Sequence, residues 1–352
     1  MLFSCPSRIT IEKGGAPIED WYGAALCKEA RRISRGEEKT KLSAIHAGIS
    51  AGVALAVTLL YYLLEKGIAR TGGLAGMGTR SILQTAATLL TNANSVLAPF
   101  WTLGFWFAAL LWVRGQTAQF GDLLAGFRRF GAYLRLLLNR GLLTVAAGFV
   151  SVYVSSYIYM MTPWSGPVVE FAQSTGMDMA VANEMIAGMD LAQMDALLYA
   201  MIPMLIIWGV LCAVLVVPML YKFRMAEYFL LDERRMGTLQ AMFHSSQMLR
   251  KRRFKLFLLD LRFWWYYGLH GLCLAVYAAD LWLPMLGIAV PEGIVTTLGL
   301  YAVYLLGLVA IQTFLRPQVQ TAYALAYERL LHMEPVMPKV QPAPKNLPWD
   351  EQ

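Results

Sequence analysis

The fold class is decided by one stretch, FKLFLLDLRFWWYYGLHGLCLAVYA, which runs from Phe254 to Ala278. It is apolar and long enough to cross the hydrocarbon core of a bilayer, which takes about 20 helical residues. Yet it carries Asp260 and Arg262 near its start and His270 near its middle. Ionisable side chains inside a span cost free energy and usually pair or serve a function. These three residues are therefore candidates for a structural or an ion-linked site.

Similar apolar runs recur along the whole chain. Its 352 residues are 57% hydrophobic and 15% charged, whereas a soluble domain is about 45–50% apolar and about 25% charged. Each run must form a helix, because a backbone exposed to lipid has to satisfy its own hydrogen bonds. The sequence predicts an all-α polytopic membrane bundle of about six transmembrane helices. The predicted spans cover residues 43–64, 96–113, 141–161, 198–221, 256–278 and 294–315.

The basic residues gather in alternate segments between these spans. Of the 30 Lys and Arg residues, 26 lie in residues 1–42, 114–140, 222–255 and 316–352. By the positive-inside rule these segments, and both termini, are cytoplasmic. The net charge of +7 is then a signal of topology. It is not a sign of nucleic-acid binding, because the basic residues lie at span ends and form no separate module.

Three parts are expected along the chain. Residues 1–42 form a cytoplasmic segment with an amphipathic helix, either lying on the leaflet or solvated beside it. Residues 43–331 form the membrane domain, in which residues 81–95 are a surface or a re-entrant helix. Residues 332–352 are rich in proline and should be disordered and cytoplasmic.

Two amphipathic surface helices are predicted between the spans. The first follows from FGDLLAGFRRFGAYLRLLLNRG, residues 120–141, whose apolar side chains recur at spacings of three, four and seven. The second precedes the 256–278 span. Arginine and lysine heads on such helices attract anionic lipid at about 1 kcal/mol each. The candidate headgroup ligands are Arg128, Arg129, Arg135, Arg250, Lys251, Arg252 and Arg253.

A short internal similarity suggests a parallel repeat. FGDLLAGF, residues 120–127, aligns with MGTLQAMF, residues 236–243, at four of eight positions. Each octapeptide follows a predicted span that enters the cytoplasm and precedes one that leaves it. The repeat would comprise residues 96–161 and 198–278, an organisation that occurs in transporters among other membrane proteins.

Three groups of residues form motifs that appear in order over roughly residues 100–331. They are Ala226, Tyr228, Leu230 and Asp232; then Ser246, Arg250, Lys251, Lys255, Leu256, Phe257, Leu259, Asp260, Leu261 and Phe263; and finally Pro317, Ala324, Tyr327 and Glu328. These motifs resemble those of a bacterial family of multi-pass membrane proteins, the domain of unknown function 975. The chain departs from that family's pattern at Arg262, where Ser is usual.

The resemblance implies an architecture and no activity. It predicts a protein with several spans in the bacterial cytoplasmic membrane. Asp232, and Glu227 beside its motif, join the structural or ion-linked candidates. The stretch around residues 126–131 resembles the family's first amphipathic helix.

Asp260 has three possible explanations. It lies about 7.5 Å along a helix from Lys255, in the cytoplasmic half of its span. Arg262 points to the opposite side of that helix and can extend its head back to the headgroups. Asp260 then either pairs with a basic residue at another helix end, or serves a proton- or ion-linked site, or lies outside a span that starts later. The candidate partners are Arg140, Lys222, Arg224 and Arg316.

The sequence favours a non-enzymatic function. It contains no nucleotide-binding loop, nucleophile elbow or metal-ligand spacing, and we expect no metal or cofactor. The first hypothesis is a membrane scaffold or accessory protein that engages anionic headgroups, a protein partner or a second copy of itself. The alternatives are a small-solute transporter or permease subunit and, third, an intramembrane enzyme.

Overall fold

The computed structural model describes residues 22–70, 77–176, 181, 185, 188–233, 236–283 and 294–333. Regular structure in these residues is helical throughout, and they contain no strand. The predicted all-helical class is confirmed. The predictions for residues 1–21 and for the tail after residue 333 fall outside the described residues.

The chain folds into two compact units whose segments alternate along the sequence. The first comprises Met1–Tyr133, Glu227–Gly237 and Phe254–Gln352. The second comprises Leu134–Ala226 and Thr238–Arg253. Each unit is therefore assembled from segments that are distant in sequence.

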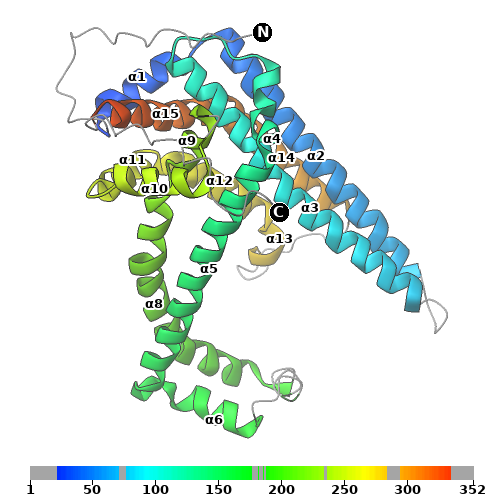
Figure 1. The fold of residues 1–352 in the computed structure, drawn as a ribbon. Helices are drawn as coiled ribbons and strands as arrows, with labels where there is room; N and C mark the ends of the chain where they lie inside the picture. Colours follow the sequence, from blue (N-terminus) through cyan, green and yellow to red (C-terminus); the bar gives the residue numbers. More distant parts are fainter. Residues whose placement is uncertain are drawn as a thin grey trace, which may run out of the picture. The chain divides into compact units, whose positions relative to one another are not determined.

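The first unit is built on three long helices. α2 (Glu37–Arg70) packs along α3 (Met77–Val113), and α14 (Ile294–Phe314) packs on α2 (Figure 1). Residues 81–95, expected to form a surface or re-entrant helix, are part of α3 without a break. A hydrogen bond of 2.8 Å joins the hydroxyls of Thr58 on α2 and Tyr301 on α14.

The N-terminal amphipathic helix is present as α1 (Ala24–Ser34). It packs against α15 (Arg316–Met333) (Figure 1). Leu26 and Ala30 on its apolar face are fully buried, and Glu29 pairs with Arg329 of α15. The apolar face of α1 therefore covers α15. The sequence predicts instead that this helix lies on the leaflet or is solvated beside it.

The prediction of one surface helix over residues 120–141 is wrong. The chain forms a 3₁₀ turn, η3 (Phe120–Leu124), and a short helix, α4 (Ala125–Arg128), and then α5 (Phe130–Met160) begins. η3 and α4 pack on α3, where Leu123 is fully buried. The apolar side chains of residues 120–128 pack on α3. Those from residue 130 onward belong to the long helix α5.

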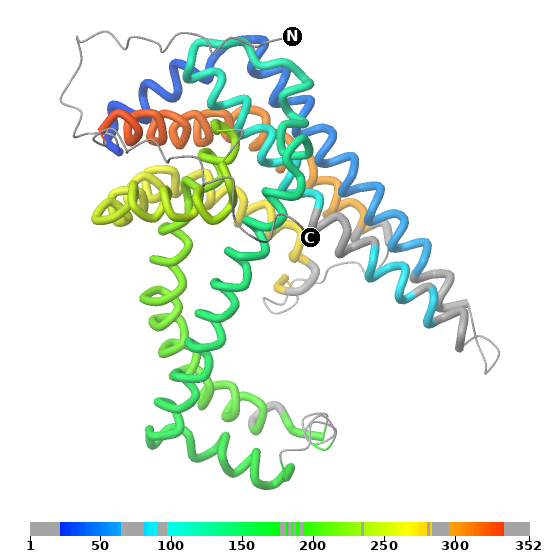
Figure 2. The backbone as a smooth tube through the Cα atoms, viewed as in Figure 1, coloured from blue at the N-terminus to red at the C-terminus, as the bar shows by residue number. Residues whose placement is uncertain are grey.

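The second unit contains most of α5, α6 (Gly166–Ser174), α8 (Leu191–Lys222) and α10 (Thr238–Met248). α6 packs against α8 near the far end of α5 (Figure 2). The buried hydroxyl of Tyr159 on α5 donates to the carbonyl of Ala200 on α8 at 2.6 Å. This bond and the α6 contacts tie the ends of two long apolar helices together.

The number of candidate spans is smaller than predicted. Three helices are long and apolar enough to cross a membrane, Glu37–Leu64, Phe130–Met160 and Gln193–Asp232. A fourth results if the pair Leu298–Phe314 and Arg316–Met333, bent by 42°, is one span. This count covers only the part of the chain that the structure describes.

The two remaining predicted spans differ from expectation in different ways. The 256–278 span is divided at Phe263 into α11 (Arg253–Arg262) and α12 (Trp264–Tyr277). The 96–113 span corresponds to a shorter apolar stretch, Leu97–Val113, at the end of α3. Both stretches are apolar, but hydropathy does not indicate where a helix breaks.

The two octapeptides that suggested a repeat have different local structures. Residues 120–127 form the 3₁₀ turn η3 and part of α4, whereas residues 238–243 belong to α10. The parallel repeat stays a prediction.

Candidate functional site

A short helix, α9 (Ala226–Asp232), lies at the centre of the candidate site. Its residues Tyr228, Phe229 and Leu230 are buried, and so is Glu227, which is only 2% exposed. A seven-residue helix has little stability of its own in water. α9 therefore depends on the side chains packed around it.

The carboxylate at the end of α9 is held by an arginine from the end of α3. Nη1 of Arg114 lies 2.6 Å from Oδ1 of Asp232, and its Nε lies 2.5 Å from Oε1 of Glu328 on α15. The hydroxyl of Tyr327 donates to the other oxygen of Asp232 at 3.3 Å. One guanidinium thus joins three segments that are each about a hundred residues or more apart in sequence.

Aromatic rings pack beside these charges. The ring of Tyr228 stacks on Trp106 of α3, with centroids 5.7 Å apart, and on Tyr327 of α15, with centroids 5.3 Å apart. Phe229 meets Tyr327 edge to face. Rings packed beside ion pairs lower the local polarity, which strengthens the attraction between the charges.

A second arginine closes the end of α9. Arg129 donates from Nη1 to the carbonyls of Leu230 and Glu233, the latter at 2.8 Å, and from Nη2 to the carbonyl of Met236 at 2.9 Å. A cation is favourable at a helix C-terminus, where carbonyls lack partners. Burial lowers the pKa of Arg129, but a guanidinium remains charged at neutral pH. The donors of Arg129 are therefore directed at protein carbonyls.

The electrostatics of the site favour a permanent ion pair. Burial alone lowers the pKa of Arg114, but the hydrogen bonds and charges of Asp232 and Glu328 outweigh it and raise that pKa above its ordinary value. Arginine is protonated throughout the accessible pH range. The arrangement can hold elements in register, and Arg114 has no part in proton transfer.

Asp260, Arg262 and His270 lie elsewhere in the first unit. Asp260 accepts a hydrogen bond of 3.0 Å from the hydroxyl of Tyr267. His270 has its Nδ1 2.9 Å from the carbonyl of Tyr266 and its ring against the Tyr266 ring. Arg262 is exposed at the end of α11. The helix-end clasp and the ion-linked role proposed for Asp260 both stay predictions.

Arg316, one of the candidate partners for Asp260, is buried in a different environment. Its Nη1 lies 3.5 Å from Nδ1 of His46 and 3.3 Å from Oε1 of Gln312. Its guanidinium covers the ring of Phe105 at 5.1 Å. The Nε2 of His46 faces the carbonyl of Trp101 at 3.2 Å. These contacts fit a neutral His46 with its proton on Nε2.

The remaining basic candidates lie on exposed or half-exposed positions. Arg128 donates to the carbonyl of Gly121 at 2.9 Å. Arg135 is exposed on α5. Arg250 and Lys251 are exposed in the turn after α10, whereas Arg252 and Arg253 are half-buried. The turn is marked by Lys251, whose φ of 64° is left-handed.

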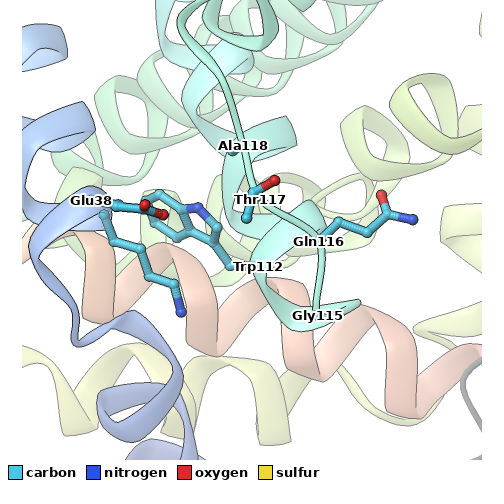
Figure 3. Close-up of a pocket in the computed structure, with 7 residues that line it drawn as sticks. Glu38, Trp112, Gly115, Gln116, Thr117 and Ala118 are labelled. Carbon is cyan, nitrogen blue, oxygen red and sulfur yellow. The ribbon is translucent and has the colours of Figure 1, made fainter.

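A small pocket lies between the start of α2 and the chain that follows α3. It has a volume of about 200 Å³ and is lined by Glu38, Lys39, Trp112 and residues 115–118 (Figure 3). The amine of Lys39 donates to the carbonyl of Ile33. With one free acid and no nucleophile–base pair, the pocket offers no recognisable chemistry. In the part of the chain that the structure describes, no group of three His, Cys, Asp or Glu residues could hold a metal.

A family model described as protein of unknown function, DUF975, matches residues 28–334. The chain belongs to this family. The DUF975 match begins at residue 28, earlier than the sequence motifs predict, and so includes most of α1 and all of α2. Comparisons with curated proteins and with solved structures found no match.

The structure brings together two of the motifs that carried the DUF975 resemblance. Tyr228 and Asp232 of the first motif meet Tyr327 and Glu328 of the last. The residue that joins them, Arg114, was missed as a site residue. In the sequence Arg114 is one of the basic residues that indicate topology, and it is the first charge after an apolar run.

Proposed function

We propose that this protein is a non-enzymatic membrane scaffold or accessory protein that engages anionic lipid headgroups through α10 and the turn that follows it. The alternatives predicted from the sequence, a transporter and an intramembrane enzyme, are favoured by no contact among the described residues. The pocket beside Trp112 is lined by neither Asp260 nor His270.

The exposed side of α10 carries the proposal. Leu239 and Phe243, one turn apart, are 72% and 61% exposed, and the turn that follows the helix carries the exposed Arg250 and Lys251. Apolar side chains followed by basic heads are typical of a helix that lies in the interface of a bilayer. Exposure of Leu239 and Phe243 to water costs free energy, whereas exposure to lipid does not.

The opposite side of α10 holds the helix in its unit. Ala241, Met242 and Met248 are buried. The buried hydroxyl of Ser245 donates to the carbonyl of Lys222 at 3.1 Å and accepts from the N–H of Met225 at 3.2 Å. α10 is thus fixed to the end of α8, a candidate span, and its position supports an interfacial role.

Native mass spectrometry of protein released from nanodiscs of phosphatidylglycerol and phosphatidylcholine tests the proposal. We expect the double variant Arg250→Gln/Lys251→Gln to retain several-fold less phosphatidylglycerol, since each headgroup contact is worth about 1 kcal/mol. The control, Lys28→Gln/Arg32→Gln, removes two exposed charges from α1. Equal losses in the two variants would refute the role of α10, and turnover of a substrate by the purified protein would refute the non-enzymatic reading.

A further inference from the structure

A second pocket lies where the turn between α1 and α2 meets the bend between α14 and α15. Its volume is about 260 Å³. Ser34, Arg35, Gly36 and Thr40 line one side, and residues 313–315, 317 and 318 line the other. All of these residues belong to the first unit.

Most of the polar side chains in this pocket already donate a hydrogen bond to the backbone. Ser34 donates to the carbonyl of Arg31, and Thr40 donates to the carbonyl of Gly36. The side-chain amide of Gln318 donates to the carbonyl of Phe314. These groups are satisfied within the protein and have little reason to bind a ligand.

Two donors in the pocket have no partner among the described residues. Thr313 is only 7% exposed, yet its Oγ1 forms no hydrogen bond, although a helical threonine can usually bond a carbonyl of the preceding turn. Arg35 is exposed and forms no hydrogen bond or ion pair with the residues that the structure describes. A buried hydroxyl without a partner is costly, and an acceptor in the pocket would remove that cost.

Arg35 is the one charged residue among those that line the pocket. The acids that follow it, Glu37 and Glu38, do not line it, and Glu37 pairs with Lys41 at 2.7 Å. The pocket therefore favours an anion. A group with several acceptor oxygens can accept from a guanidinium and a hydroxyl together, as phosphate does.

The place of the pocket indicates where such a phosphate would come from. Its wall includes Phe314, which is 63% exposed and is the last residue of the apolar helix α14. α14 is an apolar helix of 21 residues that ends at the pocket, and α2, which begins near it, contains the candidate span Glu37–Leu64. If these helices cross the bilayer, their shared end lies at the level of the headgroups.

We propose that this pocket binds the phosphate of one anionic lipid headgroup, with the Arg35 guanidinium and the Thr313 hydroxyl as its donors. The inference rests on the proposed membrane function but names a discrete site, separate from the α10 turn. It predicts one tightly held lipid, whereas an interfacial helix collects lipids in no fixed number.

Native mass spectrometry in the same nanodiscs counts the phosphatidylglycerol molecules that stay bound. We expect one stoichiometric lipid in the wild type, and about tenfold lower occupancy in Arg35→Gln and in Thr313→Val, the change that about 1.4 kcal/mol produces. Thr313→Val keeps the shape of the side chain and removes an unpaired hydroxyl. It should therefore melt no lower than the wild type, so a loss of lipid would not reflect misfolding.

The matched control is Arg32→Gln, which removes an exposed charge outside the pocket. Loss of the lipid in Arg32→Gln as well, or its retention in Thr313→Val, would overturn the site. The variant Arg250→Gln/Lys251→Gln should keep this one lipid, so failure of the α10 proposal and failure of the pocket are distinguishable.

Thermal melting of delipidated protein separates the two sources of phosphate. Phosphatidylglycerol should raise the melting temperature of the wild type and leave that of Arg35→Gln unchanged. An equal rise with inorganic phosphate alone would show that the pocket takes the free anion, and would overturn the lipid assignment.

Discussion

Arg114 is the residue on which the candidate site depends. Its two carboxylate partners are mostly shielded from water, with 22% and 15% of their side chains exposed. Removing one partner from such a group leaves charges unpaired in a region of low polarity, which costs more than the ion pairs contribute in total. Asp232 and Glu328, which share this guanidinium, would then repel each other.

We expect Arg114→Met to lower the free energy of unfolding by about 2 kcal/mol, because both carboxylates lose their partner. The control is Glu37→Gln, which breaks an exposed ion pair with Lys41 and should cost under about 0.5 kcal/mol. Reversible unfolding in mixed micelles measures both variants. If they unfolded alike, the cluster would have no structural role.

Two glycines determine how closely α3 meets η3 and α4. A Cβ on Gly104 would lie 1.7 Å from the carbonyl oxygen of Leu123, and a Cβ on Gly126 would lie 2.1 Å from that of Phe100. Both obstacles are backbone atoms, which cannot rotate away. The turn that carries the chain from α3 to α5 therefore lies directly against the backbone of α3.

We expect Gly104→Ala and Gly126→Ala each to destabilise the first unit by about 1–3 kcal/mol or more, since the packed backbones must separate. The matched control is Gly52→Ala in α2, where a Cβ meets nothing within 4 Å and alanine should be neutral or stabilising by up to about 1 kcal/mol. Melting temperatures in detergent make the comparison. A stable Gly104→Ala protein would contradict this close packing.

For the whole molecule, the charge distribution predicts which segments are cytoplasmic, and helix lengths alone do not. Three or four candidate spans among the described residues leave the number of crossings open. The alternation of basic and neutral segments predicts that both termini lie in the cytoplasm and that residues 162–197, which contain no Lys or Arg, lie outside.

Reporter fusions in a bacterial host measure this topology. We expect a green fluorescent protein fused after Gln352 to fluoresce, because it folds in the cytoplasm, and alkaline phosphatase inserted near residue 176 to be active, because it needs export. The reverse pattern would contradict the orientation, and an inactive phosphatase with a fluorescent terminus would contradict the crossing by α5.

The candidate site was only partly predictable. Asp232 and Glu227 were candidates, and Tyr327 and Glu328 were noted as parts of a motif, but nothing along the chain indicated that the two motifs meet. Arg129 was expected to face lipid and instead contacts carbonyls after α9. A basic residue beside an apolar run has the same sequence signature whether it faces headgroups or the C-terminus of a helix.

By itself the sequence determined the helical class, the family and the positions of four of the six predicted apolar helices, because these follow from local hydropathy and from motifs in order. Only the tertiary structure decided that α1 covers α15, that the 256–278 run breaks at Phe263, and that Arg114 joins α3, α9 and α15. The packing of α1 and the contacts of Arg114 join residues more than a hundred positions apart. Apolar spacing in a sequence indicates that one face of a helix is buried. It does not indicate which helix, or which lipid, covers that face.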